Sequence, residues 1–201
     1  MEKLLITNAR LVNEGAITEA DVLIAGERIE KIAPSIEAGA GTRVLDAGGR
    51  HLIPGMIDDQ VHFREPGLTH KGDMVTESAA AVAGGITSFM EMPNVDPQTT
   101  TIAALEEKYA RAAGRASANY AFYLGATNEN ISQIRALAPG TACGIKVFMG
   151  ASTGNLLVDD PEALELIFRD APVIVVTHCE DSPLIWEAEA AAREKYGDDV
   201  P

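Results

Sequence analysis

The sequence lacks the features that mark secreted, membrane-spanning and metal-knuckle proteins. Its two cysteines, Cys143 and Cys179, form no CxxC pair, so we expect buried free thiols in a reducing cytosol rather than a disulfide framework. No apolar run approaches the ~20 residues of a membrane-spanning helix. The N-terminus carries charge and asparagine too early for a signal peptide. A cytoplasmic location without membrane contact is expected.

Positive charge is also scarce. Sixteen Lys and Arg face 30 Asp and Glu, for a formal net charge of −14. Such a chain cannot neutralise a run of phosphates, so nucleic acid and anionic membranes are excluded as partners. A single local arginine can still bind a small anionic substrate. The hydrophobic fraction of 46% is enough to build a folded core.

Residues 1–50 read as a small module of short strands. β-Branched residues with partial alternation occur over residues 4–12, 20–33 and 42–49, with Gly15, Gly26 and Gly48 as breaks. This module contains no recognisable catalytic pattern.

From residue 51 onward, strands and helices alternate. Strands are expected at 51–63, 86–94, 118–127, 143–152 and 171–180, and helices at 69–85, 101–116, 128–140, 159–171 and 182–197. This alternation predicts parallel βαβ units, and the strands end in polar or metal-binding residues, as in a (β/α)8 barrel. A doubly wound sheet would carry a glycine-rich phosphate loop after its first strand, which this sequence does not have.

About five units are present, whereas a closed barrel needs eight. Five strands alone would leave open edges and an exposed interior. The predicted architecture is therefore an α/β metal-dependent hydrolase TIM barrel, truncated after about five βα units. The module of residues 1–50 would precede residues 51–201 and form part of a small β-sandwich.

The strongest motif is residues 55–67, GMIDDQVHFREPG. Side chains alternate along a strand, so Gln60, His62 and Arg64 are expected to point the same way, into the barrel mouth. Two donors two residues apart can bind one metal, and a cation beyond them can bind a substrate anion. Taken alone, one histidine on a strand is more often structural than a ligand.

This motif resembles the P-G-x-I-D-x-H-x-H-x-R-E-P-G signature of dihydroorotases and their relatives, the hydantoinases and allantoinases. Three further strings resemble family segments in the same order: FMEMPN at 89–94, GIKVFMG at 144–150 and THCE at 177–180. The resemblance covers nearly the whole chain, the N-terminal module included. It implies an N-terminal portion of such an amidohydrolase.

The resemblance implies a role for each matching residue. His62 and His178 would bind metal, and a carboxylated Lys146 would bridge two zinc ions, since a carbamate is a hard oxygen donor. Arg64 and Asn94 would bind a substrate carboxylate. The general acid/base aspartate of the family would lie beyond residue 201, so no catalytic acid/base is expected in this chain, and the chain alone is expected to be inactive. Homodimers are implied for the full-length protein.

One position departs from the family pattern. The family usually has histidine where this chain has Gln60, and an amide oxygen is a weaker metal donor than imidazole. Glutamine at this position puts the occupancy of one metal site in doubt. The run around it nevertheless resembles a bacterial branch of dihydroorotases that tolerates glutamine at this position. His51 and His70 match no ligand position and are expected to be structural.

The expected function is dihydroorotase: reversible, metal-dependent hydrolysis of the ring amide of dihydroorotate to carbamoyl aspartate in pyrimidine synthesis, by a hydroxide activated between two cations. Arg64 favours this substrate because dihydroorotate carries a carboxylate. Two alternatives stay open: an allantoinase or hydantoinase, and a metal-free scaffold, which only Gln60 favours.

Overall fold

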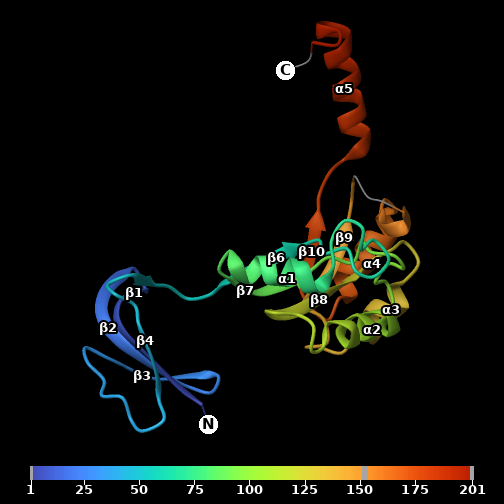
Figure 1. Ribbon diagram of the computed structural model, residues 1–201. Helices are drawn as coiled ribbons and strands as arrows, with labels where there is room; N and C mark the ends of the chain where they lie inside the picture. Colours follow the sequence, from blue (N-terminus) through green and yellow to red (C-terminus); the bar gives the residue numbers. More distant parts are fainter. Residues whose placement is uncertain (1, 151–153, 200–201) are drawn as a thin grey trace. The chain divides into compact units, whose positions relative to one another are not determined.

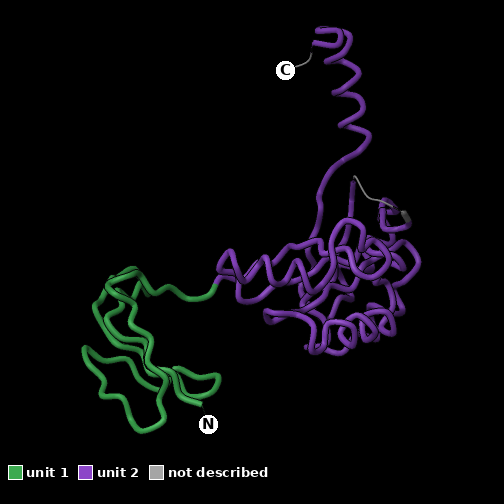
Figure 2. The backbone as a smooth tube through the Cα atoms, in the orientation of Figure 1, with its two compact units in different colours: residues 1–55 green, residues 56–201 purple. Residues whose placement is uncertain are grey.

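A computed structural model describes residues 2–150 and 154–199, and the chain forms two compact units (Figures 1 and 2). Unit 1 comprises residues 1–55 and unit 2 residues 56–201. Each unit is described by itself. Within the expected strand 143–152, residues 151 and 152 lie outside the described residues.

Unit 1 is built on one mixed sheet. Its strands are β1 (Lys3–Asn13), β2 (Ala16–Ala25), β3 (Arg28–Ala33), β4 (Arg43–Asp46) and β5 (His51–Leu52). The path runs β3-β2-β1-β4, antiparallel except for β1 with β4, and β5 pairs parallel to β1. A small core of Ile6, Ala9 and Val22 covers part of one face. The described residues of unit 1 form this single sheet, not the two stacked sheets of a complete sandwich.

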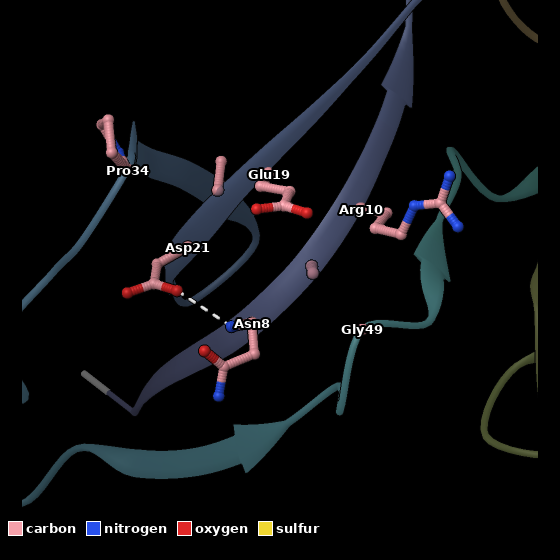
Figure 3. A pocket seen from close by; sticks show the side chains of 8 residues that line it. Asn8, Arg10, Glu19, Asp21, Pro34 and Gly49 are labelled. Atoms are coloured by element: carbon pink, nitrogen blue, oxygen red, sulfur yellow. Dashed lines mark hydrogen bonds between the residues drawn. The ribbon is translucent and has the colours of Figure 1, made fainter.

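A buried carboxylate joins the strands of unit 1 to the chain after β3. Asp21 is 8% exposed and accepts hydrogen bonds from the backbone N–H of Asn8, at 3.0 Å, and of Ile36, at 2.9 Å. It lines a pocket of about 250 Å³ together with Arg10 and Glu19 (Figure 3). None of the five predicted site residues lines this pocket. Because both carboxylate oxygens of Asp21 satisfy backbone donors, we read the residue as structural.

Unit 2 is a five-stranded parallel sheet with helices between its strands. The strands are β6 (Met56–Val61), β7 (Ile86–Glu91), β8 (Asn119–Gly125), β9 (Gly144–Phe148) and β10 (Val175–His178), in the order β10-β9-β8-β7-β6. The helices are α1 (Met74–Ala83), α2 (Ile102–Ala112), α3 (Ile131–Ala136), α4 (Pro161–Asp170) and α5 (Ser182–Tyr196), with a 3₁₀ turn η1 (Gly154–Leu156). Neighbouring strands follow one another in sequence (Figure 1), as in part of a barrel wall.

Local sequence sets where these helices begin. Asp73, Thr101, Asp160 and Asp181 each cap a helix by accepting a backbone N–H from its first turn. Two of these helices also carry proline in the first turn, where no amide hydrogen is needed. The expected helix at 69–85 starts later, at Met74, because Asp73 is its cap.

One face of the parallel sheet packs against helices and forms the main core. Alternate residues of the strands contribute to it, among them Phe89, Phe122, Leu124, Ile145 and Val147. Phe89 and Phe63 approach with ring centroids 4.6 Å apart. Because side chains alternate along a strand, the residues between these core positions lie on the other, inner face.

The expected strand at 51–63 is two strands in different units. His51–Leu52 pairs with β1 in unit 1, and Met56–Val61 pairs with β7 in unit 2. Pro54 has no amide hydrogen and Gly55 follows it, so the pairing is broken between them. The prediction of one continuous strand was therefore wrong, and the division of the chain into two units falls between Gly55 and Met56.

Both cysteines are free thiols, but only one is sheltered. Cys143 is half-buried, and burial raises its pKa to about 12. Cys179 is exposed just beyond the end of β10, so the expectation of burial was wrong for this residue. Across the described ranges, the longest apolar helical stretch falls short of what a bilayer crossing requires.

A glycine with positive φ fixes the contact between two strand-end loops. Gly67 has a φ of +80°, and a Cβ added there would lie 2.0 Å from the carbonyl oxygen of Asp96. Gly140 has a φ of +88° and open space around it. We expect Gly140→Ala to lower the free energy of unfolding by about 1 kcal/mol, the cost of the left-handed backbone alone. Gly67→Ala should cost clearly more, and equal losses in urea unfolding would contradict the close packing.

Candidate active site

The carboxyl end of β6 continues into a loop that carries two of the predicted site residues. His62 lies one residue beyond the end of β6, between Val61 and Phe63, which are both in the helix-packed core, so its ring points away from that core. Arg64 has a φ of +69°, and the peptide bond after Glu65 is cis. The strand ends at Val61, so alternation does not place Arg64; the left-handed turn does.

The loop after β7 brings Asn94 against both of these residues. His62 Nδ1 lies 2.8 Å from the side-chain oxygen Oδ1 of Asn94. Arg64 donates to the backbone carbonyl of Asn94 at 3.2 Å. An amide oxygen only accepts, so Nδ1 carries the proton and Nε2 keeps a free lone pair, the form in which histidine binds a metal. The structure thus joins His62, Arg64 and Asn94 in one cluster.

Backbone hydrogen bonds lock the two loops together below this cluster. Met92 donates to the Val61 carbonyl at 3.0 Å, and Asp96 donates to the Pro66 carbonyl at 3.1 Å. With Gly67 seated against Asp96, the loops after β6 and β7 form one packed unit. The backbone around the exposed His62–Asn94 pair is therefore held by hydrogen bonds between the two loops.

Lys146 occupies the inner face of β9. Its neighbours Ile145 and Val147 belong to the helix-packed core, and Lys146 itself is 2% exposed. In the described part of the chain its ammonium has no hydrogen bond or ion pair; it lies 5.0 Å from the centre of the Phe148 ring. Burial lowers the pKa of Lys146, which favours the neutral amine.

His178 ends β10 next to Lys146 and Phe148. Val175 packs against the core, so Val176 and His178 alternate onto the other face. The His178 ring stacks on Phe148 with centroids 6.3 Å apart, and Nε2 lies 2.9 Å from Glu180 Oε1. A metal at this nitrogen would compete with Glu180.

The positive charges of this face act on His62. Burial by the surrounding loops lowers the pKa of His62, opposed by the Asn94 hydrogen bond, and the charges of Arg64 and Lys146 lower it further. Phe148 contacts both Lys146 and His178, and so links these two residues. His178 ends β10, His62, Arg64 and Asn94 lie just beyond the ends of β6 and β7, and Lys146 lies at the middle of β9.

Two acid–base pairs that sequence patterns did not reveal anchor the loops to α2 and its following turn. Glu65, 6% exposed, accepts from the backbone of Met74 and forms an ion pair with Arg115. Burial alone would raise the pKa of Glu65, but the Arg115 hydrogen bond, the Met74 N–H and the Arg115 charge hold it below its usual value. Glu65 thereby ties the loop to the first residue of α1.

The second pair is fully buried. Lys108 Nζ lies 3.1 Å from Glu91 Oε2 and donates to the Met92 carbonyl at 3.0 Å. The Arg64 backbone N–H also faces the Glu91 carboxylate, short of full hydrogen-bond geometry. Burial raises the pKa of Glu91 and lowers that of Lys108. No sequence motif marks this pair, since both residues lie in ordinary strand and helix patterns.

The remaining candidates make none of the contacts of this cluster among the described residues. Gln60 is exposed, and its backbone N–H binds Asp58 Oδ1 at 3.1 Å. His51 lies in the sheet of unit 1, and His70 is exposed before α1. In the described ranges, no three His, Cys, Asp or Glu side chains are grouped to hold a metal. A site built partly on a lysine would not form such a group.

Comparison with known proteins gives a consistent group of relatives, although no family model matches. The chain is 32% identical to an L-hydantoinase of Paenarthrobacter aurescens over all of its length and 45% of that protein. It is 34% identical to a dihydroorotase of Methanosarcina acetivorans over 92% of its length and 40% of that protein. An allantoinase of Streptomyces avermitilis is 35% identical over 98% of the chain and 45% of that protein.

A solved structure agrees. The L-hydantoinase (dihydropyrimidinase) from Arthrobacter aurescens superposes with a TM-score of 0.89 at 31% identity, covering 99% of this chain and 45% of that one. The chain thus spans about half the length of the relatives it matches. The parallel sheet of unit 2 therefore corresponds to part of an amidohydrolase barrel.

The buried Glu91–Lys108 pair gives a test of pH dependence. Lys108→Met leaves Glu91 without its cation and should lower the free energy of unfolding by about 3 kcal/mol near neutral pH. A carboxyl whose folded pKa is raised contributes stability that is present below its unfolded pKa and lost as pH rises through the folded value. The variant should therefore be least destabilised near pH 4 and progressively worse above it, as measured by urea unfolding.

The matched control for this experiment is the double variant Glu91→Gln with Lys108→Met. It removes both charges and should recover most of the lost stability and flatten the pH dependence. Arg111→Ala, which breaks an exposed pair with Glu107 on the same helix, should change stability by no more than about 0.5 kcal/mol. A pH-independent loss in Lys108→Met would contradict a buried, ionisable Glu91.

Proposed function

This chain belongs to the amidohydrolase group of dihydroorotases, allantoinases and hydantoinases and matches their N-terminal part, and from that premise we propose that the full-length protein is a metal-dependent cyclic amidohydrolase acting on dihydroorotate. It opens the ring amide to carbamoyl aspartate and closes it again, the step used in pyrimidine synthesis. The substrate is small, and the working form is a cytoplasmic homodimer.

The observation that carries the substrate assignment is the state of Arg64. Its guanidinium is half-buried beside His62 and Asn94 and donates to the Asn94 carbonyl. Within the described residues, no carboxylate lies within ion-pair distance of it, although acidic residues outnumber basic ones almost twofold. A positioned arginine with donors to spare suits a substrate carboxylate, which it can bind with two parallel hydrogen bonds. Dihydroorotate carries such a group.

The donor set fits a divalent metal. His62 presents a free Nε2 to the inner face, and His178 adds a second imidazole. Lys146 is a buried amine with no acceptor among the described residues, and burial lowers its pKa toward the neutral form that reacts with carbon dioxide. As a carbamate it would offer hard oxygen donors suited to two zinc ions. A bound metal pair supplies Lewis acidity and activates water.

The residues of this chain then have distinct tasks. Asn94 holds the His62 tautomer that leaves Nε2 free, and Arg64 with Asn94 orients the substrate carboxylate. Phe148 lies against both Lys146 and His178. The aspartate that would carry the proton of the leaving nitrogen is expected beyond residue 201. The 201-residue chain alone should therefore show no turnover of dihydroorotate.

A hydantoinase or allantoinase is the second candidate, and the L-hydantoinase match over the whole chain favours it. These substrates lack the ring carboxylate of dihydroorotate. Arg64 would then have no anion to bind. A metal-free scaffold is the third candidate, supported only by Gln60, which is exposed and offers a neutral donor.

Substrate choice can be tested with full-length protein and its Arg64→Gln variant on dihydroorotate, hydantoin and allantoin. We expect dihydroorotate to be the preferred substrate. Arg64→Gln should lose about 1.5–3 kcal/mol of transition-state stabilisation for it, roughly 10- to 100-fold in kcat/KM. Any activity on hydantoin should change little. Equal losses on all substrates, or a wild-type preference for hydantoin or allantoin, would refute the assignment.

Metal content tests the donor set separately from turnover. Elemental analysis of full-length protein should find about two zinc ions per chain when bicarbonate is present. Lys146→Ala should lose metal, while Lys71→Ala, an exposed lysine of the loop before α1, should not. About one zinc, rising to two in Gln60→His, would mean that Gln60 has cost one site. No metal in any of these proteins would favour the scaffold.

A further inference from the structure

The edge strand of unit 2 has a bulge immediately before His62. Asp58 of β6 pairs with Phe89 of β7, and Val61 pairs with Glu91. Three steps along β6 therefore match two along β7, which leaves an extra residue in the Asp59–Gln60 segment. The ladder is broken here, so the carbonyl of Asp59 needs another partner.

A tyrosine two strands away supplies that partner. The hydroxyl of Tyr123, in β8, donates to the Asp59 carbonyl at 2.9 Å. Met90 of β7, the strand between them, has its sulfur 3.6 Å from the Tyr123 hydroxyl oxygen. The neighbouring core residues Phe122 and Leu124 face the helices, so Tyr123 lies on the inner face with Lys146. The bond therefore ties the third strand of the sheet to the bulge at its edge.

The surroundings of Tyr123 keep its hydroxyl in place. The side chain is 3% exposed, and burial raises the pKa of Tyr123 to about 12, so the hydroxyl stays protonated and donates. Gly144 of β9 leaves space for the ring, because a Cβ there would lie 3.0 Å from Tyr123 Cε1. The Asp58 carboxylate binds the Gln60 N–H on the other side of the bulge. The Asp59 carbonyl and the Gln60 N–H of the bulge thus each have a partner.

We propose that Tyr123 is a positioning residue that holds the β6 bulge and, through it, sets the orientation of His62. From Asp59 the chain has only three residues to reach His62, and Val61 between them accepts from Met92. Loss of the Tyr123 hydroxyl leaves the Asp59 carbonyl unpaired and frees the bulge to shift. A one-residue slip would turn His62 away from the inner face. Tyr123 touches no reacting group itself.

The test uses full-length protein and two tyrosine variants. Tyr123→Phe removes only the hydroxyl, and Tyr120→Phe is the matched control on the same strand. Tyr120 packs among Phe89, Tyr109 and Phe122 on the helix side, with no hydrogen bond from its hydroxyl among the described residues. Histidine-selective NMR reads the His62 ring signal, with His62→Gln identifying it. Chelator competition reads the affinity for zinc alone.

Tyr123→Phe should shift or broaden the His62 ring signal and weaken zinc binding roughly 10- to 100-fold, as is usual when an outer support of a ligand is lost. Tyr120→Phe should change neither. An unchanged His62 signal in a folded Tyr123→Phe protein would overturn the inference. If Tyr123→Phe does not fold, the exchange rate of the Tyr123 hydroxyl proton with solvent is measured in the wild-type protein. A hydrogen-bonded proton exchanges slowly, and fast exchange would refute the bond to Asp59.

The zinc measurement rests on the proposed function, and the ring signal does not. A changed ring signal with unchanged zinc affinity would mean that Tyr123 positions His62 but that His62 is not a ligand, which counts against the proposed function alone. A wild-type protein that takes up no zinc counts against the same proposal. In both cases the ring signal still decides on Tyr123.

Discussion

The alternation of side chains along the parallel strands is the constraint on which unit 2 depends. Each strand gives one set of side chains to the helices and the intervening set to the inner face. Ile145 and Val147 hold β9 in the core, and this leaves Lys146 with no direction but inward. A lysine that is 2% exposed and has no acceptor within the described ranges is costly to bury as a cation. The packing of the core thus determines the chemistry available on the other face.

At the carboxyl edge of β6, alternation ends and loop geometry takes over. Arg64 adopts a left-handed backbone, and Gly67 fits against Asp96 where no side chain could. Two ion pairs lie behind this geometry, Glu65–Arg115 and Glu91–Lys108. A buried ion pair adds little net stability. Its value here is to hold the two loops in one arrangement, so that Arg64 and Asn94 meet beside His62.

Sequence alone predicted the alternating strands and helices of unit 2, because apolar periodicity and helix caps are local signals. It also named His62, Arg64 and Asn94, which the structure brings together, and Lys146 with His178, which it links through Phe148. The sequence prediction treated residues 51–63 as one strand, because the apolar residues on both sides of Pro54 indicated a continuous strand. The roles of the Glu91–Lys108 pair and Tyr123 could not be predicted, since they depend on contacts between residues far apart in the chain.

Gln60 and His62 are neighbours on the same strand edge, but the structure supports them differently. The chain at His62 is held by the Asn94 amide, by the Val61–Met92 bond and, through the bulge, by Tyr123. Gln60 is exposed, and within the described residues its backbone N–H bonds to the Asp58 carboxylate. A metal ligand needs a fixed donor atom, and the chain has more hydrogen-bonded supports at His62 than at Gln60. If the proposed ligands His62, Lys146 and His178 hold metal, the glutamine stands at a position where the described contacts fix the chain less.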